Sequence, residues 1–131
     1  NGRQDMKRVL VVEDDDELRA VLIDVLSEEG RRVDAVRDGV EALALQNTKS
    51  YDVILCDLRL PRLDGPALYE ALHAGRYTVP FPRLIFMTGY AADRTYAAFL
   101  KRTNAPTLQK PFNLKVVRQV VNVLLSGSHS T

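Results

Sequence analysis

Carboxylate side chains occur at two places in the chain where they directly follow a run of four apolar residues. Residues 13–16 are all acidic, and Asp57 stands alone after the second run. Asp15 or Asp16 is expected to cap a helix that follows. Carboxylates that gather at one place repel one another, so keeping them ionised requires a cation. Mg²⁺ suits such a set, because it binds few carboxylate oxygens and keeps several waters. The sequence therefore predicts a magnesium site if the two places meet.

Two further polar residues, Thr88 and Lys110, follow later apolar segments. With Lys110 and a metal ion, the site would have two positive centres and one carboxylate, Asp57, that is free to act as a nucleophile. An aspartyl-phosphate is an established covalent species. Phosphoryl transfer depends mainly on in-line positioning and on neutralising the charge of the equatorial oxygens. The hydroxyl of Thr88 can donate a hydrogen bond to such an oxygen. These residue types predict a phosphoryl-transfer site.

Short apolar runs alternate with longer amphipathic stretches, and these elements must position the polar residues. We predict strands at residues 9–12, 32–36, 53–56, 84–87 and 107–108, with the less apolar second strand at an edge. Apolar residues at helical spacing predict a helix after each strand. Five such units predict an α/β, flavodoxin-like, doubly wound sheet of five parallel strands in the order 2-1-3-4-5 with five helices.

Ligands of such sheets bind outside the carboxyl ends of the strands, where the strand order reverses. Glu13 and Asp14 follow the first strand and Asp57 follows the third, which places them on the two sides of this point. Thr88 and Lys110 follow the fourth and fifth strands. All five side chains are therefore expected to converge on one crevice.

The composition indicates one soluble globular domain. The chain has 131 residues, of which 46% are hydrophobic and 27% charged, with a net charge of +1. We expect a domain over residues 7–125 with flanking tails at 1–6 and 126–131, and no contact with nucleic acid or membrane. The single cysteine, Cys56, precludes an internal disulfide and fits a reducing compartment. It is expected to be a buried apolar side chain.

Four motifs at the strand ends together resemble the receiver domain of two-component signalling proteins, over residues 7–125. They are Val11-Val12-Glu13-Asp14-Asp15, Leu55-Cys56-Asp57-Leu58-Arg59-Leu60-Pro61-Arg62-Leu63-Asp64-Gly65, Met87-Thr88-Gly89 and Gln109-Lys110-Pro111-Phe112. The stretch 99–112 resembles receivers attached to hybrid sensor histidine kinases. The start at Asn1 rather than at a methionine agrees with that origin.

The resemblance implies a role for each site residue. Asp57 is the phosphoacceptor, and Lys110 binds the phosphoryl group. Thr88 is the hydroxyl that moves to meet this group. Mg²⁺ is held by Asp14 directly, by Glu13 through water, by Asp57, and by the backbone carbonyl of Arg59. The Lys110-Pro111 peptide bond is expected to be cis.

The resemblance also implies a function and partners. The chain takes a phosphoryl group from the phosphohistidine of a histidine kinase or of a histidine phosphotransfer protein onto Asp57, with Mg²⁺, and signals or relays it. It is not an enzyme beyond its own phosphorylation and dephosphorylation, and it works in the cytoplasm. A weak homodimer through the face of the fourth and fifth helices is left open.

Three residues depart from the family pattern. Glu13 stands where an aspartate is commoner, a variation that should keep metal binding. Thr107 stands where an aromatic residue usually couples to the threonine, so the output mechanism is open. Arg59 is a long cation two residues after Asp57 that can reach over the site. Aspartate-based phosphatases have a second acidic residue at that position, so the presence of Arg59 argues against this class of enzyme. A flavin or nucleotide binder would have a glycine-rich phosphate loop in place of four acids. A pseudo-receiver that binds partners without phosphorylation remains the alternative.

Overall fold

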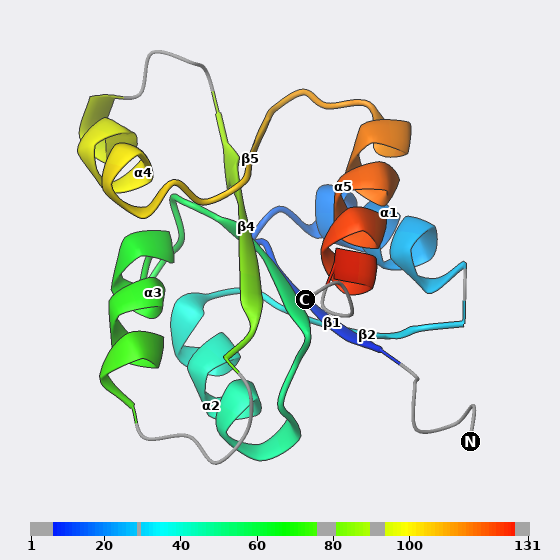
Figure 1. Cartoon of the computed structure of the whole chain (residues 1–131), viewed down its shortest axis with the longest axis horizontal. Coiled ribbons are helices and arrows are strands. Elements are labelled where there is room, and N and C mark those ends of the chain that lie inside the picture. The colour runs from blue at the N-terminus through cyan, green and yellow to red at the C-terminus, as the bar shows by residue number, and fades with distance from the viewer. Residues whose placement is uncertain (1–6, 29, 76–80, 90–93, 128–131) are drawn as a thin grey trace.

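The computed structural model of the chain describes residues 7–28, 30–75, 81–89 and 94–127, and a parallel sheet forms its centre (Figure 1). The strands are β1 (Arg8–Val12), β2 (Arg32–Val36), β3 (Val53–Asp57), β4 (Arg83–Thr88) and β5 (Thr107–Gln109). They lie in the order β2-β1-β3-β4-β5, and every neighbouring pair is parallel. The predicted fold and the edge position of β2 are confirmed.

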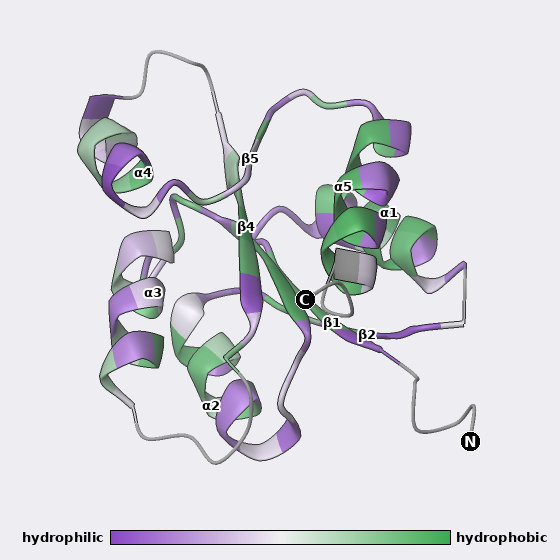
Figure 2. Ribbon diagram, in the orientation of Figure 1, coloured by the Kyte–Doolittle hydropathy of each residue, from purple (hydrophilic) through white to green (hydrophobic). Residues whose placement is uncertain are grey.

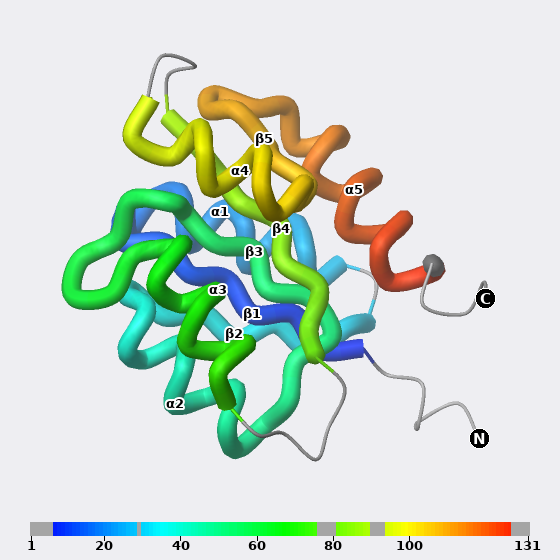
Figure 3. The backbone as a smooth tube through the Cα atoms, turned by 60° about the vertical axis from the view of Figure 1, so that its left-hand side comes forward, coloured from blue at the N-terminus to red at the C-terminus, as the bar shows by residue number. Residues whose placement is uncertain are grey.

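Helices cover both faces of the sheet, as Figures 1 and 3 show. They are α1 (Asp16–Ser27), α2 (Gly39–Lys49), α3 (Gly65–Ala74), the short 3₁₀ helix η2 (Arg94–Tyr96), α4 (Ala97–Thr103) and α5 (Leu114–Gly127). Helices α1 and α5 lie on one face, and α2, α3 and α4 lie on the other.

The apolar strand residues alternate between two separate cores, because successive side chains of a strand point to opposite faces. On β1, Val9 and Val11 pack with α1 and α5, whereas Leu10 and Val12 pack with α2, α3 and α4. Figure 2 shows the resulting hydrophobic centre, with polar residues on the outer helix surfaces. A strand buried on both faces needs a continuous apolar run, which is why these runs are visible in the sequence.

Aspartate side chains begin three of the helices. Asp15 caps α1 by accepting hydrogen bonds from the backbone N–H groups of Glu17 and Leu18, which decides the choice between Asp15 and Asp16. Asp38 caps α2, and Asp64 caps α3. These caps satisfy backbone donors that the first turn of a helix leaves unpaired.

Several elements are longer than the sequence pattern predicts. Strand β3 includes Asp57 and β4 includes Thr88, because the hydrogen-bonded ladder continues past the apolar residues. Cys56 is fully buried, as predicted, and burial raises the pKa of its thiol well above the usual value. Within the described part of the chain, no helix is long and apolar enough to cross a membrane.

Candidate functional site

Strand register brings Glu13, Asp57 and Lys110 together on one face of the sheet. Val12 pairs with Cys56, so the next residues along the two strands, Glu13 and Asp57, lie side by side. Both have the same parity along their strands as the residues that pack on α1 and α5. Lys110 follows β5 with this parity too, two residues after Leu108. The period of two in a strand therefore directs all three side chains to the same side.

The ammonium group of Lys110 bridges the two acidic residues. Its Nζ donates to Oε1 of Glu13 at 2.9 Å and to Oδ2 of Asp57 at 2.8 Å. Burial opposes the charge of Lys110, but its hydrogen bonds to the two carboxylates and their negative charges outweigh this effect and raise the lysine pKa. Lys110 is therefore a fixed positive charge beside Asp57 throughout the physiological pH range.

Glu13 is the most deeply buried member of the site, with 1% of its surface exposed. Burial raises the pKa of its carboxyl group, although hydrogen bonds from Lys110 and from the backbone N–H of Asp15 oppose this effect. The guanidinium of Arg19 donates to the backbone carbonyl of Glu13 at 2.9 Å. Sequence reasoning missed Arg19, whose only signal was its helical spacing from Asp16, with which it forms an ion pair.

The carboxylates of Glu13, Asp14 and Asp57 can hold a metal ion. One oxygen of each residue lies within 4.8 Å of the others, and Asp14 is exposed to solvent. An all-oxygen donor set of few carboxylates with one solvent-exposed member fits Mg²⁺, which keeps several of its waters. Burial of Glu13 disfavours its charged form, and a nearby cation would stabilise that form. The Lys110-Pro111 peptide bond that follows the bridging lysine is cis, as predicted.

The site opens into a cleft of about 520 Å³ at the carboxyl ends of the strands. Thr88 is half-buried in its wall, and Asp14, Asp57 and Lys110 line it too. The fifth predicted site residue, Glu13, is buried and joins the site through its hydrogen bond from Lys110. The guanidinium carbon of Arg59 lies 5.5 Å from the ring centroid of Tyr96, and both residues line the cleft. Tyr96 also packs in the hydrophobic core. Thr107, by contrast, is exposed and its hydroxyl donates to the carbonyl of Ala105.

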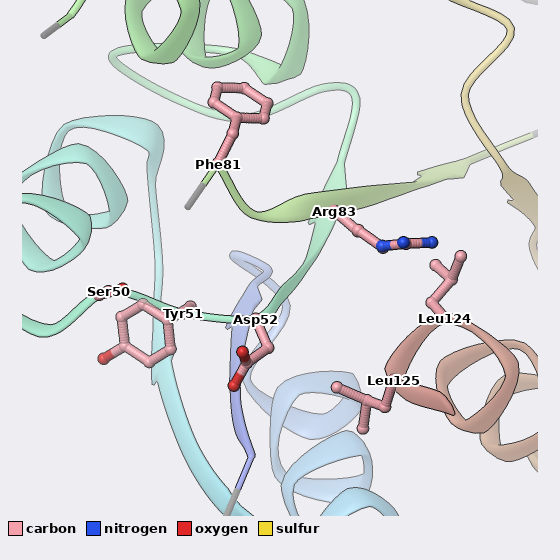
Figure 4. A pocket seen from close by; sticks show the side chains of 7 residues that line it. All are labelled: Ser50, Tyr51, Asp52, Phe81, Arg83, Leu124 and Leu125. Carbon is pink, nitrogen blue, oxygen red and sulfur yellow. The ribbon is translucent and has the colours of Figure 1, made fainter. Parts of the chain in front are cut away.

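A second pocket, of about 220 Å³, lies at the opposite end of the sheet, where β3 and β4 begin (Figure 4). Its charged lining residues are Asp52 and Arg83, and the Asp52 carboxylate already accepts the backbone N–H of Arg8. This pocket has no group of carboxylates comparable with the one around Asp57. The chemistry of the described residues is therefore concentrated at the carboxyl ends.

Comparison with known proteins identifies the family. The response regulator receiver domain matches residues 9–122. The chain is 36% identical over 113 residues to the transcriptional regulatory protein TcrA of Mycobacterium tuberculosis, covering 86% of this chain and 44% of that protein. It is 35% identical over 123 residues to the sensor kinase CckA of Brucella abortus, covering 89% of this chain and 12% of that protein.

A solved structure agrees with these sequence matches. The signal receiver domain of a signal transduction histidine kinase from Syntrophus aciditrophicus superimposes with a TM-score of 0.83 at 29% identity, covering 95% of this chain and 94% of that one. The chain thus belongs to the receiver domains of two-component response regulators, and it has the phosphoacceptor function of that family. Receiver domains bind Mg²⁺ through an acidic cluster, and they interact with histidine kinases or phosphotransfer proteins. The chain spans less than half the length of TcrA.

Proposed function

We propose that Asp57 accepts the phosphoryl group from a phosphohistidine in a reaction that requires Mg²⁺ held by Glu13, Asp14, Asp57 and the backbone carbonyl of Arg59. The observation that carries this assignment is the position of Lys110. Its Nζ contacts Oδ2 of Asp57 and Oε1 of Glu13, and both residues also belong, with Asp14, to the acidic group that can hold a metal ion. Of these two carboxylates, Asp57 lines the open cleft whereas Glu13 is only 1% exposed, so Asp57 is the one that a phosphoryl group can reach.

The chemical step follows from this arrangement. A carboxylate oxygen of Asp57 attacks phosphorus, the P–O bond forms, and the bond from phosphorus to the histidine nitrogen breaks in line. The released imidazole keeps the electron pair and takes a proton from solvent. Lys110 and the half-buried Thr88 hydroxyl are placed to bind phosphoryl oxygens, and Mg²⁺ held by Glu13, Asp14 and Asp57 would neutralise the charge that spreads over them. Positioning and charge neutralisation are the tasks that such transfer demands of a protein.

The assignment is tested by intact mass spectrometry after treatment with a small phosphodonor. The chain should gain one phosphoryl group with Mg²⁺ and none with a chelator. Asp57→Asn should gain none, whereas the matched variant Asp24→Asn, at an exposed position of α1, should behave as the wild type. Equal modification of Asp57→Asn and the wild type would refute the assignment of the phosphoacceptor.

The buried acidic site gives no support to a pseudo-receiver. Such a module is expected to have lost part of the site, but Glu13, Asp57 and Lys110 are hydrogen-bonded to one another and Asp14 lies beside them. The chain is accordingly proposed to catalyse only its own phosphorylation and dephosphorylation, and to do so in the cytoplasm, where histidine kinases present their phosphohistidine.

Exposed valines on α5 support a weak homodimer through the face of α4 and α5. Val116 is 41% exposed and Val123 is 67% exposed. They are seven residues apart, which places them on the same face of the helix. Analytical ultracentrifugation should show weak self-association that Val123→Asp abolishes. An unchanged sedimentation profile in that variant would exclude this face.

A further inference from the structure

The loop between β3 and α3 carries the Arg59 carbonyl that is proposed to bind Mg²⁺. Its two ends are joined, because the backbone N–H of Gly65 donates to the carbonyl of Leu58 at 2.9 Å. Leu58 is in turn held to the sheet through the carbonyl of Met87. The two ends of the loop formed by residues 59–64 are therefore fixed. The backbone conformation between them depends on contacts that the loop makes away from the sheet.

A strained turn lies within this loop. The backbone N–H of Leu63 donates to the carbonyl of Pro61 at 2.7 Å, and Arg62 between them has a φ of 67°. A three-residue turn with a positive φ at its centre belongs to the rare and strained class of γ-turns. Residues other than glycine keep such a conformation only when the surroundings enforce it. The surroundings of Arg62 must therefore supply that constraint.

The side chain of Arg62 is held by a buried aspartate at the start of α2. Its Nε donates to Oδ2 of Asp38 at 2.9 Å, and its Nη2 donates to Oδ1 at 3.3 Å. Paired bonds between a guanidinium and one carboxylate fix orientation as well as distance. The Asp38 side chain is only 10% exposed, and its Oδ1 also caps α2 by accepting the N–H of Glu41. The anchor for Arg62 is thus rigid.

The backbone of the loop also contacts the start of α2. A Cβ atom placed on Gly39 would lie 2.1 Å from the carbonyl oxygen of Leu63, so only glycine permits this approach. The ion pair and the backbone contact hold neighbouring residues, Arg62 and Leu63, against the same helix end. Together these two contacts fix the part of the loop that precedes α3.

We propose that the Arg62–Asp38 ion pair is a positioning clamp that sets the Arg59 carbonyl for Mg²⁺ by holding the strained turn three residues away. The inference rests on the proposed function, because it takes the Arg59 carbonyl to be a metal ligand. Arg62 is a positioning residue and touches neither the metal nor the phosphoryl group. Without the clamp the turn relaxes, and the peptide groups between residues 59 and 62 reorient.

The test measures Mg²⁺ binding to the chain by isothermal titration calorimetry, beside phosphorylation by a small phosphodonor. Arg62→Ala should weaken Mg²⁺ affinity about tenfold, as loss of an outer-shell partner does. Phosphorylation at saturating Mg²⁺ should recover, because Asp57 and Lys110 are unchanged. Arg102→Ala is the matched control: Arg102 is similarly exposed and pairs with Glu70 on the surface. Its Mg²⁺ affinity should equal that of the wild type.

Further variants separate the clamp from general stability. Asp38→Asn keeps a good helix cap but loses the charge, and it should weaken Mg²⁺ binding as much as Arg62→Ala. The double variant should be no weaker than either single variant, because both remove one interaction. Arg62→Gly adopts a positive φ without strain and should also bind Mg²⁺ weakly, because the anchor is gone.

Three outcomes would overturn the clamp. They are wild-type Mg²⁺ affinity in Arg62→Ala, wild-type affinity in Arg62→Gly, and additive losses in the double variant. In each of these cases Mg²⁺-dependent phosphorylation of the wild type would leave the proposed function intact. A wild-type chain that neither binds Mg²⁺ nor needs it for phosphorylation would refute the proposed function and the clamp with it.

Discussion

Replacing Lys110 by methionine removes a cation that contacts both buried acids of the site. Methionine preserves the apolar stem of the lysine while deleting the ammonium group. Oε1 of Glu13 and Oδ2 of Asp57 then lose donors at 2.9 and 2.8 Å. Glu13 cannot turn to solvent instead, because 1% of its side chain is exposed. The variant therefore leaves two neighbouring carboxylates without a fixed counter-charge.

The cost follows from the burial and spacing of these groups. Two unit charges 4.8 Å apart, the outer limit for the acidic oxygens, repel by about 3 kcal/mol at an effective dielectric constant of about 20. Breaking a buried ion pair by removing one partner costs about 3–5 kcal/mol. Lys110 is 25% exposed, which favours the lower value. A loss of about 3 kcal/mol corresponds to a fall in Tm of about 10 °C for a domain of this size.

Urea unfolding followed by circular dichroism checks this magnitude with and without Mg²⁺. Mg²⁺ should restore part of the stability, because it binds only the folded acidic cluster. Burial raises the pKa of Glu13, so its protonation relieves the repulsion. The loss should therefore be small below the unfolded pKa of glutamate and grow as the pH rises through the folded value. A loss below about 1 kcal/mol at neutral pH, or one equally large with and without Mg²⁺, would refute the reasoning.

Three further predictions concern the elements that surround the site. Gly39→Ala should lower Tm although alanine is the better helix former, because its Cβ meets the Leu63 carbonyl oxygen at 2.1 Å; a raised Tm in thermal melts would show that the loop yields. The hydrogen bonds from Arg62 lower the pKa of Asp38, so its contribution to stability is present above the unfolded pKa and disappears as the pH falls through the folded value. The difference in urea unfolding between the wild type and Asp38→Asn should accordingly vanish in strong acid, and a difference that persists there would contradict this. Asp15→Ala should cost about 1 kcal/mol by the loss of the α1 cap, which denaturant unfolding measures; no change would mean that another residue caps the helix.

The helices and strands and most residues of the site are predictable from the amino-acid sequence. Apolar runs such as residues 9–12 are visible because a strand buried on both faces admits no polar side chain. The order of five such runs and helices leaves few chain paths, so the sheet order was predictable as well. Glu13, Asp14, Asp57, Thr88 and Lys110 follow these runs, which was sufficient to predict one crevice for all five.

Strand alternation contained one more piece of information. Successive side chains of a strand point to opposite faces of the sheet. This alternation places Cys56 on the face covered by α2, α3 and α4, and it places Glu13, Asp57 and Lys110 together on the other face. The proximity of Lys110 to both acidic residues could therefore be predicted from the sequence. Which carboxylate oxygens it contacts could not, since those contacts join residues 97 and 53 positions apart and depend on side-chain rotamers.

The contacts between loops and helix ends, in contrast, are visible only in the folded chain. Asp38 and Arg62 are 24 residues apart, and each alone has an ordinary local interpretation as a helix cap and a surface cation. The placement of Arg59 over Tyr96 likewise joins two segments that have no shared period. Hydrophobic periodicity specifies which residues form each element, because burial repeats along the chain. It says nothing of polar side chains in loops, whose partners are set by the packing of whole elements against one another.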